Sequence, residues 1–243
     1  MTKKVTNFRE LVKRGDLEGV RANIGKVKNI NRRNCYGQTY LHEVLIRSYG
    51  ELRQMLIDEL LKAGADVNAR TKNGCTPLFY TINVHVINTL INAGADVNAK
   101  DEDGNTPLHA AVGIDDLKTL IEAGADVNAR NHRFDTPLHT NYKFGQLKAL
   151  IEAGADINAS NQDQETAIYY AVKGGNVDCV ELFIDARADL SVRNKNGESV
   201  QDIASGELLT RIQSAMAAHE KVSLQNTLPQ AHPPKPKSRA LRI

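Results

Sequence analysis

Three histidines recur at one position of a repeated motif, and histidine is the residue type most often used for metal binding and proton transfer. His42, His109 and His139 each stand three residues after a threonine, in T-Y-L-H, T-P-L-H and T-P-L-H. Equivalent positions on neighbouring packed helices lie about 10 Å apart, whereas zinc ligands share one ion at about 2 Å. We therefore expect these rings to hydrogen bond the backbone of a neighbouring loop, and we predict no metal and no cofactor.

Four aspartates recur in the same way, and paired carboxylates are the usual groups of acid–base catalysis. Such a pair must share one cleft and have separated pKa values. Here each carboxylate follows a G-A pair at the same place in its copy, which indicates a structural turn instead: Asp66, Asp96, Asp126 and Asp156. The chain also has no phosphate-binding glycine loop, no G-x-S-x-G and no H-E-x-x-H. We predict that the protein is not an enzyme; the alternative is a convergent site in the region from Arg133 to Phe144.

The copies have a regular period. Gly-Ala-Asp begins at Gly64, Gly94, Gly124 and Gly154, three steps of 30 residues, and a fifth copy, Arg187-Ala188-Asp189, follows after 33. The threonine motif keeps the same register. Within one copy, Thr106 before Pro107 is a typical helix start, and Leu117, Leu120 and Ile121 share one face of a second helix. Because such short helices are marginal alone, we predict a solenoid in which each unit packs on its neighbours.

The residues G-x-T-P-L-H, a helix pair and G-A-D-V-N-A resemble the ankyrin repeat, over roughly residues 5 to 217. The resemblance implies an all-α solenoid of helix-turn-helix units with projecting loops like β-hairpins. We predict an N-terminal capping repeat at 1–33, five repeats at 34–193, a C-terminal cap at 194–218 and a disordered, basic, proline-containing tail at 219–243. The 30-residue steps lack three residues between the helices of a pair, so the central repeats should have clipped helices or a tighter joint.

Composition limits the compartment and the class of partner. The chain is 41% hydrophobic without Trp, so we expect a core of Leu, Ile, Val and Ala. No apolar run is long enough for a membrane span or a signal peptide. The three cysteines fit no metal or disulfide spacing, and we expect reduced thiols in a cytoplasmic protein: Cys35, Cys75 and Cys179. We predict no membrane insertion.

The net charge of +2 is unevenly distributed. From Ala218 onward the sequence contains five Lys or Arg and one acidic residue, Glu220. That segment therefore carries +4, and the remainder of the chain about −2. A phosphate-binding surface would show as a basic stripe. The nearly neutral net charge of the remainder argues against such a stripe. We therefore predict no nucleic-acid partner.

Partner-binding positions are expected where the copies differ. The loop tips vary while their flanks stay constant, and the family resemblance implies that loop tips and first helices form the recognition face. The tip candidates are Lys72, Asp101, Glu102, His132, Arg133, Phe134, Gln162 and Gln164. Helix candidates are Tyr80, Tyr142, Lys143 and Tyr170. Phe134 is the sharpest, because it replaces the turn glycine of Gly74 and Gly104; the alternative is that it packs locally against Tyr142 or Phe144.

We therefore expect an adaptor, scaffold or inhibitor that binds a protein partner. The alternative is an effector of an intracellular bacterium, delivered into a host cytosol and acting on a host protein. The tail contains Pro233-Pro234-Lys235-Pro236 and ends in Leu241-Arg242-Ile243, patterns that short-motif-binding domains read, although a plain solvated tail explains them too. The Asn residues of the D-(V/I)-N-A motifs resemble hydroxylation sites of ankyrin domains, with the repeat consensus itself as the simpler explanation.

Overall fold

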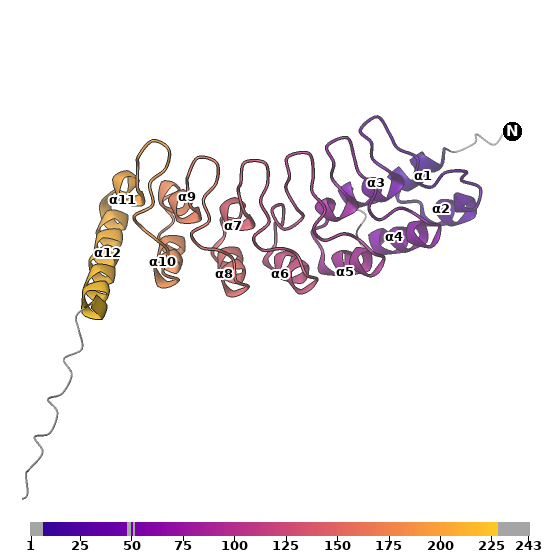
Figure 1. The fold of residues 1–243 in the computed structure, drawn as a ribbon. Helices are drawn as coiled ribbons and strands as arrows, with labels where there is room; N and C mark the ends of the chain where they lie inside the picture. Colours follow the sequence, from indigo (N-terminus) through magenta and orange to yellow (C-terminus); the bar gives the residue numbers. More distant parts are fainter. Residues whose placement is uncertain (1–6, 48–49, 51, 228–243) are drawn as a thin grey trace, which may run out of the picture.

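The computed structural model describes residues 7–47, 50 and 52–227, and within them the fold is all-helical without a named strand. The helices alternate between two rows (Figure 1). The first row holds α1 (Phe8–Arg14), α3 (Tyr40–Ile46), the 3₁₀ helix η1 (Pro77–Tyr80), α7 (Pro137–Thr140), α9 (Ala167–Lys173) and α11 (Val200–Ile203). The second row holds α2 (Leu17–Ile24), α4 (Leu52–Lys62), α5 (Val84–Asn92), α6 (Ile114–Glu122), α8 (Phe144–Glu152) and α10 (Val177–Asp185), with α12 (Gly206–Thr227) closing the stack.

The predicted solenoid is confirmed: one continuous hydrophobic core runs between the rows, mostly aliphatic but with Phe183 and two tyrosines in it. The leucine that recurs every 30 residues on the second helices is buried in each copy, at Leu60, Leu90, Leu120 and Leu150. Consecutive second helices pack on one another, α5 on α6, α6 on α8 and α8 on α10. Each unit therefore completes its core only with its neighbours, as the short helices require.

The ends of the helices follow from local sequence. Thr136 is the extended N-cap of α7, and Pro137 occupies the first helical position, where the absent N–H costs nothing. α6 ends at Glu122; Gly124 then takes a left-handed φ of 88°, and the N–H of Ala125 donates to the carbonyl oxygen of Leu120 across the turn. The same G-A-D element therefore ends the second helix and redirects the chain into the next loop.

The predicted shortening of the central repeats is confirmed and falls on the first helices. α3 and α9 have seven residues each, whereas η1 and α7 have four, and residues 107–110 form turns only. The second helices α5, α6 and α8 keep nine residues. The three missing residues thus come from the last turn of the first helix. The first row therefore has a step where a short unit meets a long one.

The connecting loops project from one side of the stack (Figure 1). They are tight turns with a single isolated bridge in the described part of the chain, between Ser160 and Thr166, so the expected likeness to β-hairpins does not extend to strands. At the C-terminal end, the prediction that the tail starts at residue 219 is wrong, since α12 continues to Thr227. The segment HEKVSLQNT at 219–227 contains no helix breaker before Pro229. The proline string and the terminal Leu241-Arg242-Ile243 lie outside the described residues.

Candidate partner-binding surface

The recurring histidines connect each unit to the next loop, as predicted. In the third unit the Nδ1 atom of His109 accepts from the Thr106 backbone N–H at 3.1 Å, and Nε2 lies 3.1 Å from the carbonyl oxygen of Asp135. His42 and His139 make the equivalent pairs of contacts. Burial lowers the pKa of His42 to about 4 and also lowers the pKa of His109 and His139. The three rings are therefore neutral scaffold groups at pH 7.

The loop tips are joined to one another by a chain of backbone hydrogen bonds. The N–H of one tip donates to a carbonyl oxygen of the preceding tip at 2.8–3.0 Å: Lys72 to Tyr36, Glu102 to Asn73, His132 to Asp103, Gln162 to Arg133 and Lys195 to Asp163. This close stacking needs a glycine at most tips. A Cβ on Gly104, at φ 80°, would lie 3.0 Å from the backbone nitrogen of His132. The tips consequently form a rigid, continuous row, which we call the loop-tip row.

Most of the predicted tip residues are exposed along the loop-tip row: Lys72, Glu102, His132, Arg133, Phe134, Gln162 and Gln164. Asp101 is different, because its carboxylate accepts from the backbone N–H groups of Asp103 and Asn105 and from the Asn105 side chain. It therefore shapes the turn. Arg133 lies 3.4 Å from the Asp163 carboxylate and 3.6 Å from that of Asp135, exposed ion pairs that contribute little to stability.

Phe134 occupies the left-handed slot that glycine fills in four other loops, at Gly37, Gly74, Gly104 and Gly197. Its φ is 60° and its side chain is 53% exposed. A bulky residue in this conformation costs about 1–3 kcal/mol, and the exposed ring regains little of that from burial. The ring makes no ring contact with Tyr142 or Phe144 in the described structure, so the alternative of local aromatic packing receives no support. Gln164 fills the same slot of the next tip, with a φ of 61° and an exposed side chain, so Phe134 differs from it by presenting an aromatic ring.

The helix candidates fall into two groups. Tyr80 and Tyr170 are half-buried and pack edge-on against histidines of the preceding unit, Tyr80 on His42 and Tyr170 on His139. The hydroxyl of Tyr170 also accepts from the Asn161 side chain at 2.9 Å. Tyr142 and Lys143 are exposed after the short helix α7, and Tyr142 is 64% exposed. Two aromatic residues thus serve contacts between units, while Tyr142 remains open to solvent.

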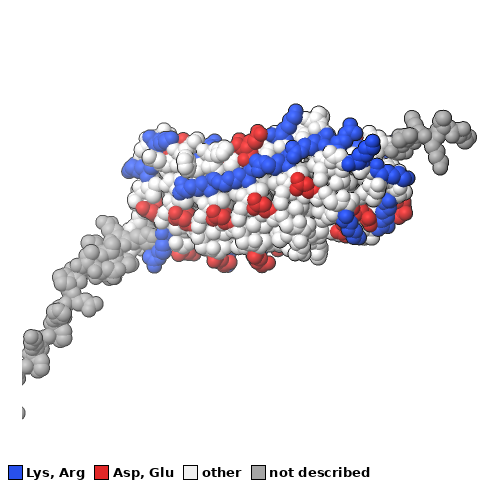
Figure 2. Space-filling model, turned by 45° about the vertical axis from the view of Figure 1, so that its right-hand side comes forward, with Lys and Arg blue, Asp and Glu red and all other residues white. Residues whose placement is uncertain are grey.

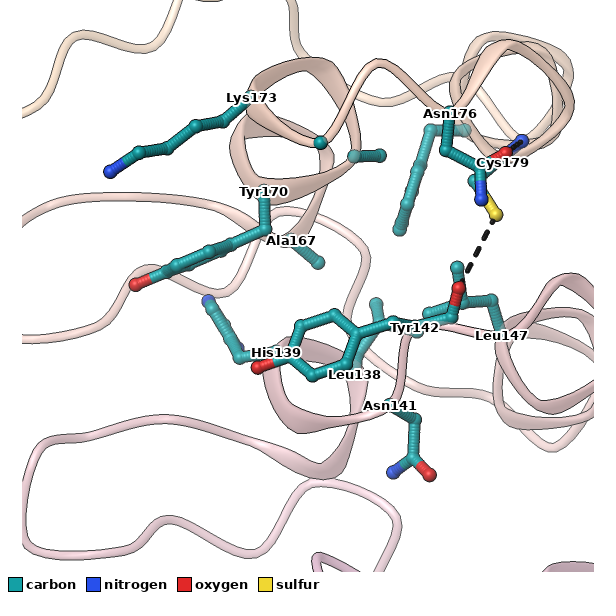
Figure 3. A pocket seen from close by; sticks show the side chains of 13 residues that line it. Leu138, His139, Asn141, Tyr142, Leu147, Ala167, Tyr170, Lys173, Asn176 and Cys179 are labelled. Atoms are coloured by element: carbon teal, nitrogen blue, oxygen red, sulfur yellow. Dashed lines mark hydrogen bonds between the residues drawn. The ribbon is translucent and has the colours of Figure 1, made fainter. Parts of the chain in front are cut away.

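A pocket of about 390 Å³ lies between the α7–α8 and α9–α10 pairs, beside Tyr142 and Tyr170. Figure 3 shows the two tyrosine rings and the Lys173 side chain extending toward the same side of the pocket. The thiol of Cys179 donates to the carbonyl oxygen of Tyr142 at 3.7 Å, and burial raises the pKa of this thiol. The sequence analysis did not predict this pocket. Its signal is the change from a 30-residue to a 33-residue step, which places a four-residue first helix next to a seven-residue one.

The surface carries a basic band that the sequence analysis missed. Figure 2 shows Lys and Arg side chains crossing one face, with acidic side chains in a parallel row below. Residues after the D-V-N-A motifs include Arg70, Lys100 and Arg130, all exposed. Lys100 donates to the carbonyl oxygen of Arg130, and Arg130 to that of Ser160. The expectation of no basic stripe is therefore wrong, because the net charge sums the band with the neighbouring aspartates; the absence of a nucleic-acid partner stays a prediction.

The Asn residues of the D-(V/I)-N-A motifs form a second ladder between units. Asn98 accepts from the Asp126 backbone N–H at 2.8 Å and donates to the carbonyl oxygen of Gly124 at 3.2 Å. Asn68 and Asn128 repeat both contacts in their own units. The repeated asparagine thus has a structural role, which explains its spacing; modification of these residues stays an alternative.

Comparisons with known proteins agree with the geometry. A family model of ankyrin repeats in three copies matches residues 9–101 and 53–131, and one in many copies matches residues 150–204. A comparison with curated protein sequences finds no match. Across the described residues, no helix is both long and apolar enough to span a membrane.

Two solved structures share the fold. The ankyrin repeat domain of Bcl-3, described as a unique member of the IkappaB protein family, has a TM-score of 0.72 and 22% identity, covering 87% of this chain and 99% of that chain. The human ASB11 ankyrin repeat domain has a TM-score of 0.73 and 23% identity, covering 86% of this chain and 97% of that chain. Identities at this level establish the common fold alone.

Proposed function

Since the chain belongs to the ankyrin repeat family, whose domains generally bind other proteins, we propose that it is a non-enzymatic binding module that uses the loop-tip row and the neighbouring first helices. The module would act as an adaptor, scaffold or inhibitor. Hydrogen bonds between successive tips hold the row before any partner arrives. Binding to a preformed surface requires little ordering of the chain, which favours affinity.

The observation that supports this proposal most directly is the exposed, left-handed Phe134. Glycine would fit the same turn without strain, as it does at Gly74 and Gly104. Aromatic residues and arginine are enriched in protein interfaces relative to the rest of the surface. Phe134 and Arg133 therefore form the expected centre of the contact, with His132 on the same tip and Gln162 on the next one.

The test is affinity capture with purified protein as bait. A bait with Arg133→Ala and Phe134→Gly should lose the partner. A bait with Arg187→Gly should retain it, because Arg187 also has a positive φ, 65°, but lies at the end of α10. This control relieves the same type of backbone strain away from the row. A bait ending at Thr227 tests whether the tail carries the interaction.

Retention of every captured protein by the double variant would contradict the proposal. Loss of the partner only on truncation after Thr227 would instead favour the effector alternative, in which the repeats carry a tail that holds the signal. Equal melting temperatures of the double variant and the Arg187→Gly control are needed to exclude loss of binding through unfolding.

A further inference from the structure

The pocket beside Tyr142 arises from the step in the first row of helices. α7 ends at Thr140, whereas α9 continues through a further turn to Lys173 before Gly174 ends it. The last turn of α9, with Ala171 and Lys173, consequently has no helical neighbour in the preceding unit and forms one wall of the pocket. The volume of about 390 Å³ lies in the range of about 300–1,000 Å³ that ligand pockets occupy.

The interior of this pocket is apolar and its edge is polar. Leu138, Leu147 and Phe183, each at most 3% exposed, line its inner part. Tyr142 and Tyr170 stand beside them, with both rings extending toward the same side as Lys173 (Figure 3). The imidazole of His139, which also lines the pocket, is already held by Thr136 and Glu165. A bulky apolar group could therefore enter the pocket without breaking a hydrogen bond of His139, and it would contact the buried side chains.

One charged side chain, Lys173 on the last turn of α9, is among the described residues that line the pocket. Lys143 and Lys173 occupy equivalent positions of consecutive units, seven residues after Thr136 and Thr166. Both are exposed, and neither forms an ion pair with any described residue. Lys143 does not line the pocket, because its ammonium donates to the carbonyl oxygen of Val112 in the preceding unit, at 3.0 Å, and Lys173 is therefore the cation at the pocket. This arrangement is complementary to a ligand that carries a carboxylate next to its apolar group.

We propose that the pocket receives one bulky apolar side chain from an acidic segment of the protein partner, with a carboxylate of that segment facing Lys173. The proposal rests on the proposed function and adds the chemistry of the partner to it. The pocket supplies a deep anchor point and Phe134 an exposed contact on the loop-tip row. The chain's own tail is a poor occupant by charge, because its basic residues would face Lys173: Lys235, Lys237, Arg239 and Arg242.

Acidic peptides provide the direct test. The chain contains no Trp, so tryptophan fluorescence reports on the peptide alone. Three capped peptides, Asp-Glu-Xaa-Glu-Asp with Xaa as Trp, Leu or Ala, are titrated against the full chain. Binding of the Trp peptide is measured by its tryptophan fluorescence. Binding of the Leu and Ala peptides is measured by their competition with the Trp peptide. We expect the Trp and Leu peptides to bind at least about tenfold more tightly than the Ala peptide. Equal affinities of the three would overturn the proposal.

Substitutions in the protein locate the site. Ala171→Leu should fill the pocket and weaken the Trp peptide at least about tenfold. Its matched control, Ala111→Leu, places the same side chain at the equivalent position of another unit, five residues after Thr106, and should leave affinity within about twofold. Lys173→Glu, a change of an exposed residue, should weaken binding of the acidic Trp peptide and strengthen binding of a Lys-Lys-Trp-Lys-Lys peptide. Unchanged affinity in either Ala171→Leu or Lys173→Glu would overturn the proposal, so the test does not depend on one variant folding.

The outcomes separate this inference from the proposed function. A captured partner that depends on Arg133 and Phe134 but binds Ala171→Leu normally would leave the proposed function standing and remove the pocket from it. Peptide binding could instead depend on Ala171 and Lys173 while the Phe134 variant retains every captured partner. That result would support the pocket and contradict the role of the loop-tip row. Higher peptide affinity after truncation at Thr227 would show that the tail competes for the pocket, against the assignment to a partner.

Discussion

The Nε2 atom of His139 lies 3.1 Å from the carbonyl oxygen of Glu165, in the loop of the following unit. On the other side of the ring, Nδ1 accepts the backbone N–H of Thr136 at 3.1 Å. The ring can serve both partners only as the neutral tautomer with its proton on Nε2, because a protonated Nδ1 would face an N–H donor. The same pair of contacts at His42 and His109 makes the joint between units sensitive to protonation.

The first prediction is that stability falls as the pH drops from about 6.5 to about 4. The pKa of His42 is lowered to about 4 in the folded chain from an ordinary 6.5, and those of His109 and His139 are lowered too. The unfolded chain therefore binds more protons in this window, and the free energy of unfolding decreases with decreasing pH. The His42 shift alone corresponds to on the order of 3 kcal/mol at its acid end.

Urea unfolding at several pH values measures this dependence. Carboxylates also titrate in the window, so the comparison is with His42→Gln, which should be less stable at pH 7 and show a smaller slope between pH 6.5 and 4. Identical slopes in the two proteins would mean that His42 does not stay neutral in the folded state.

The second prediction concerns the asparagine ladder. Asn98→Ala removes two hydrogen bonds between units, to Asp126 and Gly124, and should lower the free energy of unfolding by about 1–2 kcal/mol. Asn88→Ala is the matched control, since Asn88 is an exposed residue of α5 whose side chain makes no hydrogen bond to a described residue. It should not destabilise the chain, because Ala is favoured over Asn at an exposed helix position by about 0.7 kcal/mol or less. Similar losses in both variants, measured by urea unfolding, would contradict the structural role of the ladder.

The third prediction is an order of thiol reactivity. Cys35 is exposed, Cys75 is half-buried and Cys179 is buried, and burial raises the pKa of the last two thiols. Alkylation by iodoacetamide under native conditions should modify Cys35 first and Cys179 last, at least about tenfold more slowly. Peptide mass spectrometry distinguishes the three sites. Fast labelling of Cys179 would indicate that the pocket wall formed by α10 opens readily.

Two motifs in register, T-P-L and G-A-D, were sufficient to predict the helix pairs. T-P-L marks the start of the first helix of a pair, and G-A-D follows the end of the second. Counting from Leu108 to Gly124 and from Ile168 to Arg187 also predicted the shortened joint. The pocket was missed, because it depends on how two units of different length pack, which neither unit encodes alone. The basic band was missed for a related reason: residues 30 apart, such as Arg70 and Lys100, become neighbours only through the stacking.

The last prediction contrasts two residues with opposite roles. Leu120 is 3% exposed in the core between α6 and its neighbours, so Leu120→Ala should lose about 2–5 kcal/mol of stability through lost burial and the cavity left behind. Phe134→Gly removes an exposed ring and relieves a left-handed φ of 60°. The relief of about 1–3 kcal/mol is offset by the greater chain entropy of glycine in the unfolded state, about 1 kcal/mol. Its stability should therefore equal or slightly exceed that of the parent. Thermal and urea unfolding of both variants decide this, and destabilisation by Phe134→Gly comparable to that of Leu120→Ala would mean that Phe134 supports the fold rather than a partner.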